Sequence, residues 1–252
     1  MRKLGLQLYT VREALKNDFL GTLKQVASCG YAGVELAGNM GGMSVAQLRK
    51  VLDDLGLKAI GGHCVVDAVG NDFDRLLADY ATLGAKYLGV AWLGEDYRTA
   101  EGALRAGKLM ERAGLEAGKH DMTFFYHNHA FEFENKIGSK YMLDAFFDAV
   151  DPALVKWEMD AFWVKKGGED PLAYIKRYAG RVPLMHIKDM TADESHTYEI
   201  VGAGIIDYTP ILKEGDAAGV DWYIVEQDQC PKGEVESARA SYQNIVARGW
   251  LG

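Results

Sequence analysis

The stretch YHNHAFEFE, residues 126–134, gathers side chains that can bind a metal ion and move protons. His127 and His129 are one residue apart, and Glu132 lies three residues beyond the second histidine. Imidazole and carboxylate groups are ligands for divalent metals, and an imidazole can also act as a base near neutral pH. These residues form a site only if other segments of the chain bring matching side chains to the same place.

Eight short apolar stretches have the length and composition of strands, and a helical pattern follows each of them. The helical stretches carry apolar residues at positions i, i+3, i+4 and i+7, and two of them end in glycine, at Gly30 and Gly56. The predicted strands are residues 4–9, 33–36, 58–64, 87–92, 123–128, 155–160, 182–188 and 222–227.

This strict alternation predicts a parallel sheet, because a helix must cross over before each new parallel strand. Eight such units in 252 residues fit a closed (β/α)₈ TIM barrel of the α/β class better than an open sheet. The first strand is not followed by GxGxxG, which argues against dinucleotide binding. No linker or change in composition divides the chain, so residues 1–252 are predicted to form a single TIM-barrel domain.

In such a barrel, function lies where the strands end and the following loops begin. Polar and aromatic side chains gather at these predicted ends, and four of the six histidines are among them. A barrel whose histidines served only stability would give no such bias. The residues at the predicted ends are Tyr9, Glu35, His63, Trp92, His127, His129, Glu132, Asp160, His186, Lys188, Asp189 and Glu226.

Asp160 and Glu226 each end a run that is otherwise apolar. A buried carboxylate without a partner is costly, so each of them needs a cation, a hydrogen-bond network or a metal. Together with His186 they form a mixed nitrogen and oxygen ligand set that suits Mn²⁺, Co²⁺ or Zn²⁺, whereas Mg²⁺ is less suited to a histidine ligand. The alternative is an Asp–His–Glu hydrogen-bond network without a metal.

The composition excludes several classes of partner and location. The net charge of −8 argues against nucleic-acid binding. Cys29, Cys64 and Cys230 are odd in number and have no CxxC spacing, which argues against a disulfide framework. No apolar stretch approaches the roughly 18 residues that a membrane span needs, and the N-terminus lacks the apolar core of a signal peptide. We therefore expect a cytoplasmic protein that binds neither membranes nor nucleic acid.

The chain resembles the xylose isomerase-like TIM barrels, the sugar phosphate isomerases/epimerases, over essentially its full length. The resemblance rests on the order and spacing of LGLQLYTVRE, GYAGVELAG, GGHC, YHNHAFEFE, WEMDAFWVKKGGEDP, MHIKDM, EIVGAGIIDYTPIL and YIVEQD. It implies one divalent metal ion held by residues from strands five to eight. By position, Asp160, His186 and Glu226 resemble the ligands of strands six, seven and eight.

Strand five departs from the family pattern. Sugar epimerases of this family usually end that strand with a glutamate that binds the metal and moves a proton, whereas this chain has His127 there. Either His127 takes that position or Glu132 reaches back from the loop. We expect Glu132 to be the fourth ligand, with His127 and His129 facing the substrate. The departure puts a two-glutamate proton shuttle in doubt.

The resemblance implies a metal-dependent sugar isomerase or epimerase that removes a proton next to a carbonyl and passes through an enediolate. Glu226, His127 and His129 are the candidates to move the proton. Elimination from the same enediolate is the alternative and would make the enzyme a lyase or dehydratase acting on a keto-sugar. A non-catalytic sugar-binding barrel and a metal-dependent hydrolase are rivals from other classes.

The expected substrate is a small carbohydrate, and self-association into a homo-oligomer is an expectation of the family. The loop EIVGAGIID is glycine-hinged, but the region around it is rich in Asp and Glu and therefore poorly suited to a phosphate. The residues predicted to contact the sugar are Tyr9, Glu35, His63, Trp92, Phe162 and Lys188.

Overall fold

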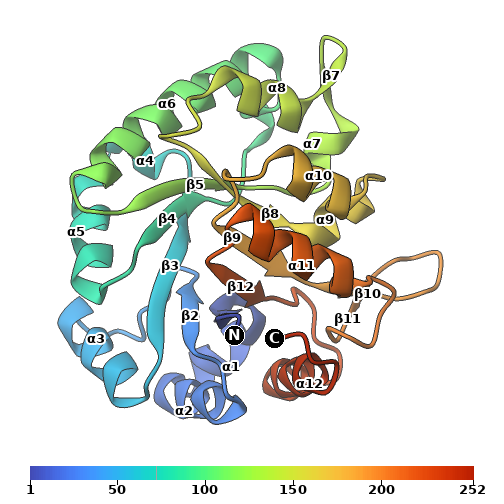
Figure 1. Cartoon of the computed structure of the whole chain (residues 1–252). Coiled ribbons are helices and arrows are strands. Elements are labelled where there is room, and N and C mark those ends of the chain that lie inside the picture. The colour runs from blue at the N-terminus through green and yellow to red at the C-terminus, as the bar shows by residue number, and fades with distance from the viewer. Residues whose placement is uncertain (72) are drawn as a thin grey trace.

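A closed barrel of parallel strands forms the centre of the molecule, as seen in the computed structural model of the chain, which describes residues 1–71 and 73–252 (Figure 1). The strands follow one another around the barrel in the order β1-β12-β9-β8-β5-β4-β3-β2. The (β/α)₈ prediction is thereby confirmed. The barrel strands are β1 (Leu4–Gln7), β2 (Gly33–Leu36), β3 (Lys58–Cys64), β4 (Tyr87–Val90), β5 (Thr123–His127), β8 (Lys156–Asp160), β9 (Leu184–Ile187) and β12 (Trp222–Val225).

Helices surround the barrel on the outside (Figure 1). No helix among the described residues is long and apolar enough to span a lipid bilayer. The longer helices are α2 (Phe19–Cys29), α3 (Val45–Asp54), α5 (Phe73–Leu83), α6 (Ala100–Gly118), α8 (Met142–Ala149), α10 (Pro171–Arg177), α11 (Tyr208–Ala218) and α12 (Glu234–Ala247). All of them lie within or next to stretches whose periodicity predicts a helix.

The ends of these helices follow local sequence signals. Asp18 accepts a hydrogen bond from the backbone N–H of Gly21 at the start of α2, and Gly30 ends that helix with a φ of 107°. Ser44 and Gln47 form a reciprocal capping box at the start of α3. Such caps fix where each helix begins, and hence how the loops before it leave the barrel.

Five barrel strands, namely β1, β4, β5, β9 and β12, end one or two residues before the C-terminal ends that the sequence predicts, whereas β2, β3 and β8 end where predicted. Tyr9, for example, lies in a 3₁₀ helix, η1 (Leu8–Val11), and not at the end of a strand. Such short elements are too brief to give a periodic pattern. The remaining ones are η2 (Glu95–Tyr97), α1 (Arg12–Asn17), α4 (Ala68–Asn71), α7 (Phe131–Glu134), α9 (Ala161–Lys166), and the hairpins β6 (Lys136–Ile137) with β7 (Lys140–Tyr141) and β10 (Asp189–Met190) with β11 (Tyr198–Glu199).

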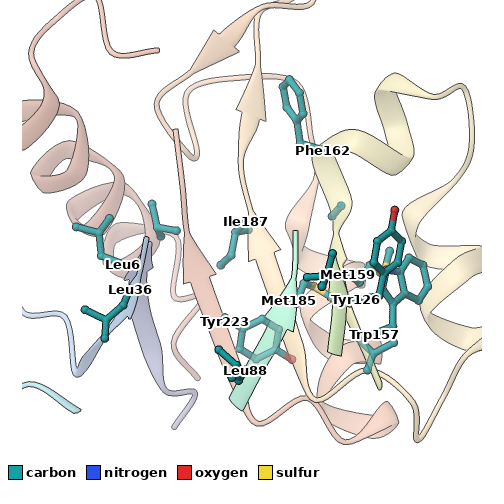
Figure 2. Packing of buried hydrophobic residues seen from close by; sticks show 14 of the residues in the cluster. Leu6, Leu36, Leu88, Tyr126, Trp157, Met159, Phe162, Met185, Ile187 and Tyr223 are labelled. Carbon is teal, nitrogen blue, oxygen red and sulfur yellow. The ribbon is translucent and has the colours of Figure 1, made fainter. Parts of the chain in front are cut away.

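Residues alternate between the two faces of each barrel strand. In β8, Trp157 and Met159 face outward and pack in the cluster between barrel and helices that Figure 2 shows, together with Met185 of β9 and Leu88 of β4. A separate, smaller cluster lies inside the barrel. It consists of Ile60, Tyr87, Phe125, Leu184, Trp222 and Ile224, and we call it the apolar floor.

Glycines on neighbouring strands make room for the apolar floor. A Cβ atom at Gly5 would lie 2.3 Å from a side-chain carbon of Ile60, and one at Gly89 would lie 2.3 Å from the ring of Phe125. The large floor residues therefore fill space that the neighbouring strands leave free.

Candidate active site

Polar side chains form a second layer inside the barrel, next to the apolar floor and toward the C-terminal ends of the strands. The strand register brings them together, since Gln7 pairs with Glu35, His127 with Glu158, and Asp160 with His186. We call this set the polar layer. Its members are Gln7, Glu35, His63, His127, Glu158, Asp160, His186, Lys188 and Glu226.

Glu158 is the shared partner of two histidines. Its Oε2 atom is 2.7 Å from Nε2 of His63 and 2.9 Å from Nδ1 of His127. A carboxylate can only accept, so the ring nitrogens facing it carry the protons. Burial opposes ionisation of Glu158, but His186 and His63 hold its pKa well below the usual value. The other oxygen, Oε1, is buried and has no hydrogen-bond partner among the described residues.

His186 lies between two carboxylates. Its Nε2 atom is 2.7 Å from Glu35, and its Nδ1 atom is 2.9 Å from Glu226. Burial lowers the pKa of His186, but Glu158 and Glu35 outweigh it and raise that pKa well above the ordinary value. Gln7 donates a 2.7 Å hydrogen bond to the same oxygen of Glu35. Burial and the neighbouring Glu158 raise the pKa of Glu35 to about 7.

Lys188 supplies the fixed positive charge of the polar layer. Its ammonium group is 2.6 Å from Glu226, 3.0 Å from Asp160 and 3.0 Å from Asp228. Burial opposes the charged form, but these three carboxylates raise the pKa of Lys188 well above its ordinary value. The carboxylates of β8 and β12 are thereby partly neutralised even though both are buried.

Two groups of side chains in the polar layer could hold a metal ion. Within each group, the candidate ligand atoms all lie within 4.8 Å of one another. The first group is His63, His127, Glu158 and His186, and the second is His127, Asp160, His186 and Glu226.

The second group fits a divalent metal on the chemistry of its donors. Two imidazoles and two carboxylates form a set suited to Mn²⁺, Co²⁺ or Zn²⁺. Burial lowers the pKa of His127 to about 3, so that ring is neutral, as a ligand must be. His186, which its carboxylate neighbours keep protonated, would release the Nδ1 proton that faces Glu226 when a metal binds. Glu158 and Glu35 hold the far nitrogens of His127 and His186, which is the usual arrangement behind metal-binding histidines.

A cavity of about 870 Å³ opens above the polar layer. Its aromatic wall surrounds His129, whose ring centroid lies 4.9 Å from that of Trp92, 5.3 Å from Trp163 and 6.1 Å from Phe131. Burial and the neighbouring His127 lower the pKa of His129 well below its usual value, so the ring is neutral. Its Nδ1 atom and the Nε1 atom of Trp163 are buried without hydrogen-bond partners among the described residues. Both residues line the cavity, and these two atoms keep an unused hydrogen-bonding capacity.

Most of the predicted site residues meet at this cavity. Glu35, Asp160 and His186 are completely buried in the polar layer below it. The predicted residues that line the cavity are Tyr9, His63, Trp92, His127, His129, Lys188 and Glu226.

Two predicted site residues have other surroundings. Glu132 accepts hydrogen bonds from the hydroxyl of Tyr126 and from the backbone N–H of His129, at 2.8 Å for the latter. Among the described residues, the groups able to hold a metal contain His127 and do not contain Glu132. Phe162 is completely buried, stacks on Tyr198 at 5.1 Å and is not part of the cavity lining (Figure 2).

Sequence reasoning missed several residues of the site. Glu158 had a usable signal, because in KWEMD it lies two residues before Asp160 and so must point to the same face of the strand. Gln7 lies two residues before Tyr9, which the sequence predicts as the end of that strand, and was therefore not selected. Arg98 directly follows the 3₁₀ helix η2, and Trp163 lies in the short helix α9; the strand pattern predicts the geometry of neither.

Solved structures share this fold. A protein of Parabacteroides distasonis ATCC 8503, described as a sugar phosphate isomerase/epimerase, superposes with a TM-score of 0.85 at 23% identity, covering 100% of this chain and 96% of that one. The IOLI protein, solved with a bound zinc atom, superposes with a TM-score of 0.78 at 15% identity, covering 99% of each chain.

Curated relatives include enzymes named inosose dehydratase. The one from Lacticaseibacillus casei is 30% identical over 139 residues, which are 48% of this chain and 46% of that protein. The chain therefore spans about half the length of this relative. The one from Geobacillus kaustophilus (strain HTA426) is 25% identical over 253 residues, covering 83% and 80%.

A family match covers most of the barrel. Residues 23–244 match the family described as xylose isomerase-like TIM barrel, in agreement with the closed strand order and with the polar layer at the strand ends. The chain belongs to the xylose isomerase-like TIM-barrel family.

Proposed function

We propose that the chain is a metal-dependent lyase that removes water from a keto-sugar. The observation that carries the proposal is the buried group His127, Asp160, His186 and Glu226 next to an aromatic-walled cavity. Sequence reasoning put isomerisation or epimerisation first and elimination second. The name inosose dehydratase, borne by several relatives, supports the reverse order.

The four residues of that group are proposed to hold one divalent ion. In this proposal the fourth ligand is His127 and not Glu132. When bound, such an ion polarises the substrate carbonyl and stabilises the negative charge that develops on its oxygen. The zinc atom in the IOLI structure supports a metal in this fold, and the donor set equally suits manganese or cobalt.

His129 is the residue we assign to take the proton from the carbon next to the carbonyl. It lines the cavity as a neutral imidazole, which can accept a proton. Glu132 fixes the backbone of His129 through the 2.8 Å hydrogen bond to its N–H. In this proposal Glu132 therefore positions the base and does not bind the metal.

Lys188 and His63 face the cavity from different strands. The Lys188 ammonium group, held by Asp160, Glu226 and Asp228, would offset the charge of these carboxylates. Burial lowers the pKa of His63, but Glu35 and Glu158 outweigh it and raise that pKa above its ordinary value. As an imidazolium whose Nε2–H faces Glu158, His63 would give its Nδ1 proton to the leaving hydroxyl. One proton then moves to His129 and one hydroxyl leaves the β-carbon with a proton from His63, so the net change is the loss of one water molecule.

The test is to incubate the protein and Mn²⁺ with an inosose and with open-chain keto-sugars in deuterated water. Loss of water, seen as an unsaturated ketone by ultraviolet absorption and by proton NMR, supports the lyase. Deuterium at the carbon next to the carbonyl without loss of water would instead establish an epimerase or isomerase. Binding of these sugars without either change would favour a non-catalytic sugar-binding barrel.

The control in this experiment is Asp160→Asn. Asparagine can still accept the hydrogen bond from the Trp163 N–H that begins α9, so the fold is kept while the ligand charge is removed. Turnover by this variant at the wild-type rate would contradict the metal assignment.

A further inference from the structure

We propose that Arg98 is an anion-recognition residue of the cavity, so that the substrate carries a carboxylate or phosphate group. The statement that this anionic group belongs to the substrate rests on the proposed function. The binding site itself rests on the geometry around Arg98.

Aromatic rings hold the Arg98 guanidinium in place. Its central carbon lies 3.8 Å from the ring centroid of Phe131 and 4.5 Å from that of Trp92. The Nε atom donates a 2.9 Å hydrogen bond to the carbonyl of Leu93. A guanidinium fixed in this way loses little conformational freedom when a ligand binds.

The terminal nitrogens of Arg98 are available. Throughout residues 1–71 and 73–252, no carboxylate forms an ion pair with this guanidinium, and Nε is the atom that donates a hydrogen bond. Arg98 lines the cavity. A planar pair of N–H donors is the geometry that carboxylates and phosphates bind best.

The other cations that line the cavity are already engaged. Lys188 is surrounded by three carboxylates. Arg12 donates from one terminal nitrogen to the carbonyl of Tyr9 and from the other to that of Asp228, each at 2.8 Å. Among the described cavity residues, Arg98 is thus the cation whose terminal nitrogens donate a hydrogen bond to no other residue.

The two ends of the cavity differ in charge, with Arg98 at one end and carboxylates at the other. Asp160, Glu226 and Asp228 make the end at β8 and β12 acidic, which suits a metal and hydroxyl groups. Arg98 lies on the loop after β4, next to Trp92 and Phe131, which also flank His129. A substrate with its anionic group at Arg98 would therefore extend across His129 toward the polar layer. The acidic loops that argued against phosphate binding lie elsewhere, after β9 and β12.

The experiment is calorimetric titration of the full chain, without metal, with gluconate, glucose 6-phosphate and glucose. Wild type is expected to bind at least one of the two anions about 10- to 100-fold more tightly than glucose, as charge-assisted hydrogen bonds imply. Preference for gluconate alone identifies a carboxylate, and preference for the phosphate ester alone identifies a phosphate. Equal binding of all three compounds would overturn the proposal.

Substitutions test whether the preference for anions over glucose depends on Arg98. Arg98→Gln should abolish the preference, and Arg98→Lys should retain only part of it, because lysine keeps the charge and lacks the planar donors. Arg75→Gln removes the same charge from an exposed arginine on α5, whose partner Asp79 lies 3.9 Å away, and should leave the preference intact. A preference that survives in Arg98→Gln, or that Arg75→Gln removes equally, contradicts the assignment.

The experiments separate a failure of the anion-site proposal from a failure of the proposed lyase function. If Arg98→Gln loses the anion preference while wild type turns over no keto-sugar, the anion site is supported and the lyase function is rejected. If wild type turns over neutral keto-sugars faster than their acidic or phosphorylated counterparts, the anionic substrate is rejected and the lyase function is supported.

Discussion

Glu158 determines which nitrogens of His63 and His127 carry protons, since one of its oxygens faces a ring nitrogen of each. We expect Glu158→Gln to lower the affinity for Mn²⁺ or Zn²⁺ by about 10- to 100-fold, the usual effect of removing a carboxylate behind a metal-binding histidine. Competition with a chelator measures this affinity. Glu116→Gln, which changes an exposed glutamate on α6, is the matched control. Unchanged affinity in Glu158→Gln would show that Glu158 does not orient a ligand.

Glu132 makes stability depend on pH. Burial raises the pKa of its carboxyl group in the folded protein to about 8, from an ordinary value of 4.5. Between these values the folded state holds a proton that the unfolded state has released. The stabilisation is therefore complete at pH values below the unfolded pKa and is lost as pH rises through the folded pKa.

The corresponding prediction concerns Glu132→Gln. The free energy of unfolding of wild type should fall relative to that of the variant by roughly 1 kcal/mol per pH unit between about pH 5 and pH 8. Urea unfolding of the two proteins at several pH values measures the difference. Parallel curves over this range would mean that Glu132 is ionised in the folded protein.

At the scale of the element, the loop between β9 and α11 depends on a single buried carboxylate. Asp189 accepts hydrogen bonds from the backbone N–H groups of Met190 and Ile206 through one oxygen, and of Gly202 and Gly204 through the other. A Cβ atom at Gly204 would lie 2.3 Å from the Asp189 carboxylate, so glycine is required at this close approach.

Asp189→Asn should destabilise the protein by about 2–4 kcal/mol, because the new NH₂ group faces backbone donors and leaves two of the four hydrogen bonds unmade. Hydrogen exchange should show lost protection at Gly202 and Gly204. Asp193→Asn in the exposed part of the same loop, where Ser195 is the hydrogen-bond donor, should have a much smaller effect. Equal effects of the two substitutions would contradict this role for Asp189.

The sequence allows the long elements to be predicted and hides the short ones. Strands such as β2 and helices such as α6 have enough residues for their periodicity to be read. Short helices at the barrel mouth, such as α7 and α9, cover about one turn, so no period is visible. Their positions decide where Trp163 and Glu132 point. Glu132 therefore looked free to bind a metal, whereas in the structure its oxygens contact Tyr126 and the backbone of His129.

The polar layer itself was largely predictable, because the rule that strand ends carry the function applies to every strand of a barrel. Asp160, His186 and Glu226 follow from that rule. The contacts among them do not, because they depend on strand register. Pairing of Asp160 with His186 and of His127 with Glu158 is set by interactions along whole strands.

At the scale of the whole molecule, a bound metal should stabilise the barrel, because the second metal-binding group joins β5, β8, β9 and β12. A metal present at about 100 times its dissociation constant adds about 2.7 kcal/mol to the free energy of unfolding. For a chain of this length that corresponds to a rise in Tm of roughly 5–10 °C. Thermal unfolding with Mn²⁺ or Zn²⁺, and with a chelator, measures it.

Asp160→Asn provides the comparison for this prediction. It should lose most of the metal-dependent rise in Tm and still unfold cooperatively. A rise of the same size in the variant would mean that the metal binds elsewhere, for example at the group that contains His63 and Glu158.

The apolar floor and the polar layer occupy successive rows of the same strands. Leu184 and His186 are two residues apart on β9, and Phe125 and His127 are two residues apart on β5. Folding depends mainly on the first row and chemistry on the second. Descendants of such a chain can therefore exchange the residues of the reactive row and acquire new reactions, while the row beneath them preserves the architecture they inherit.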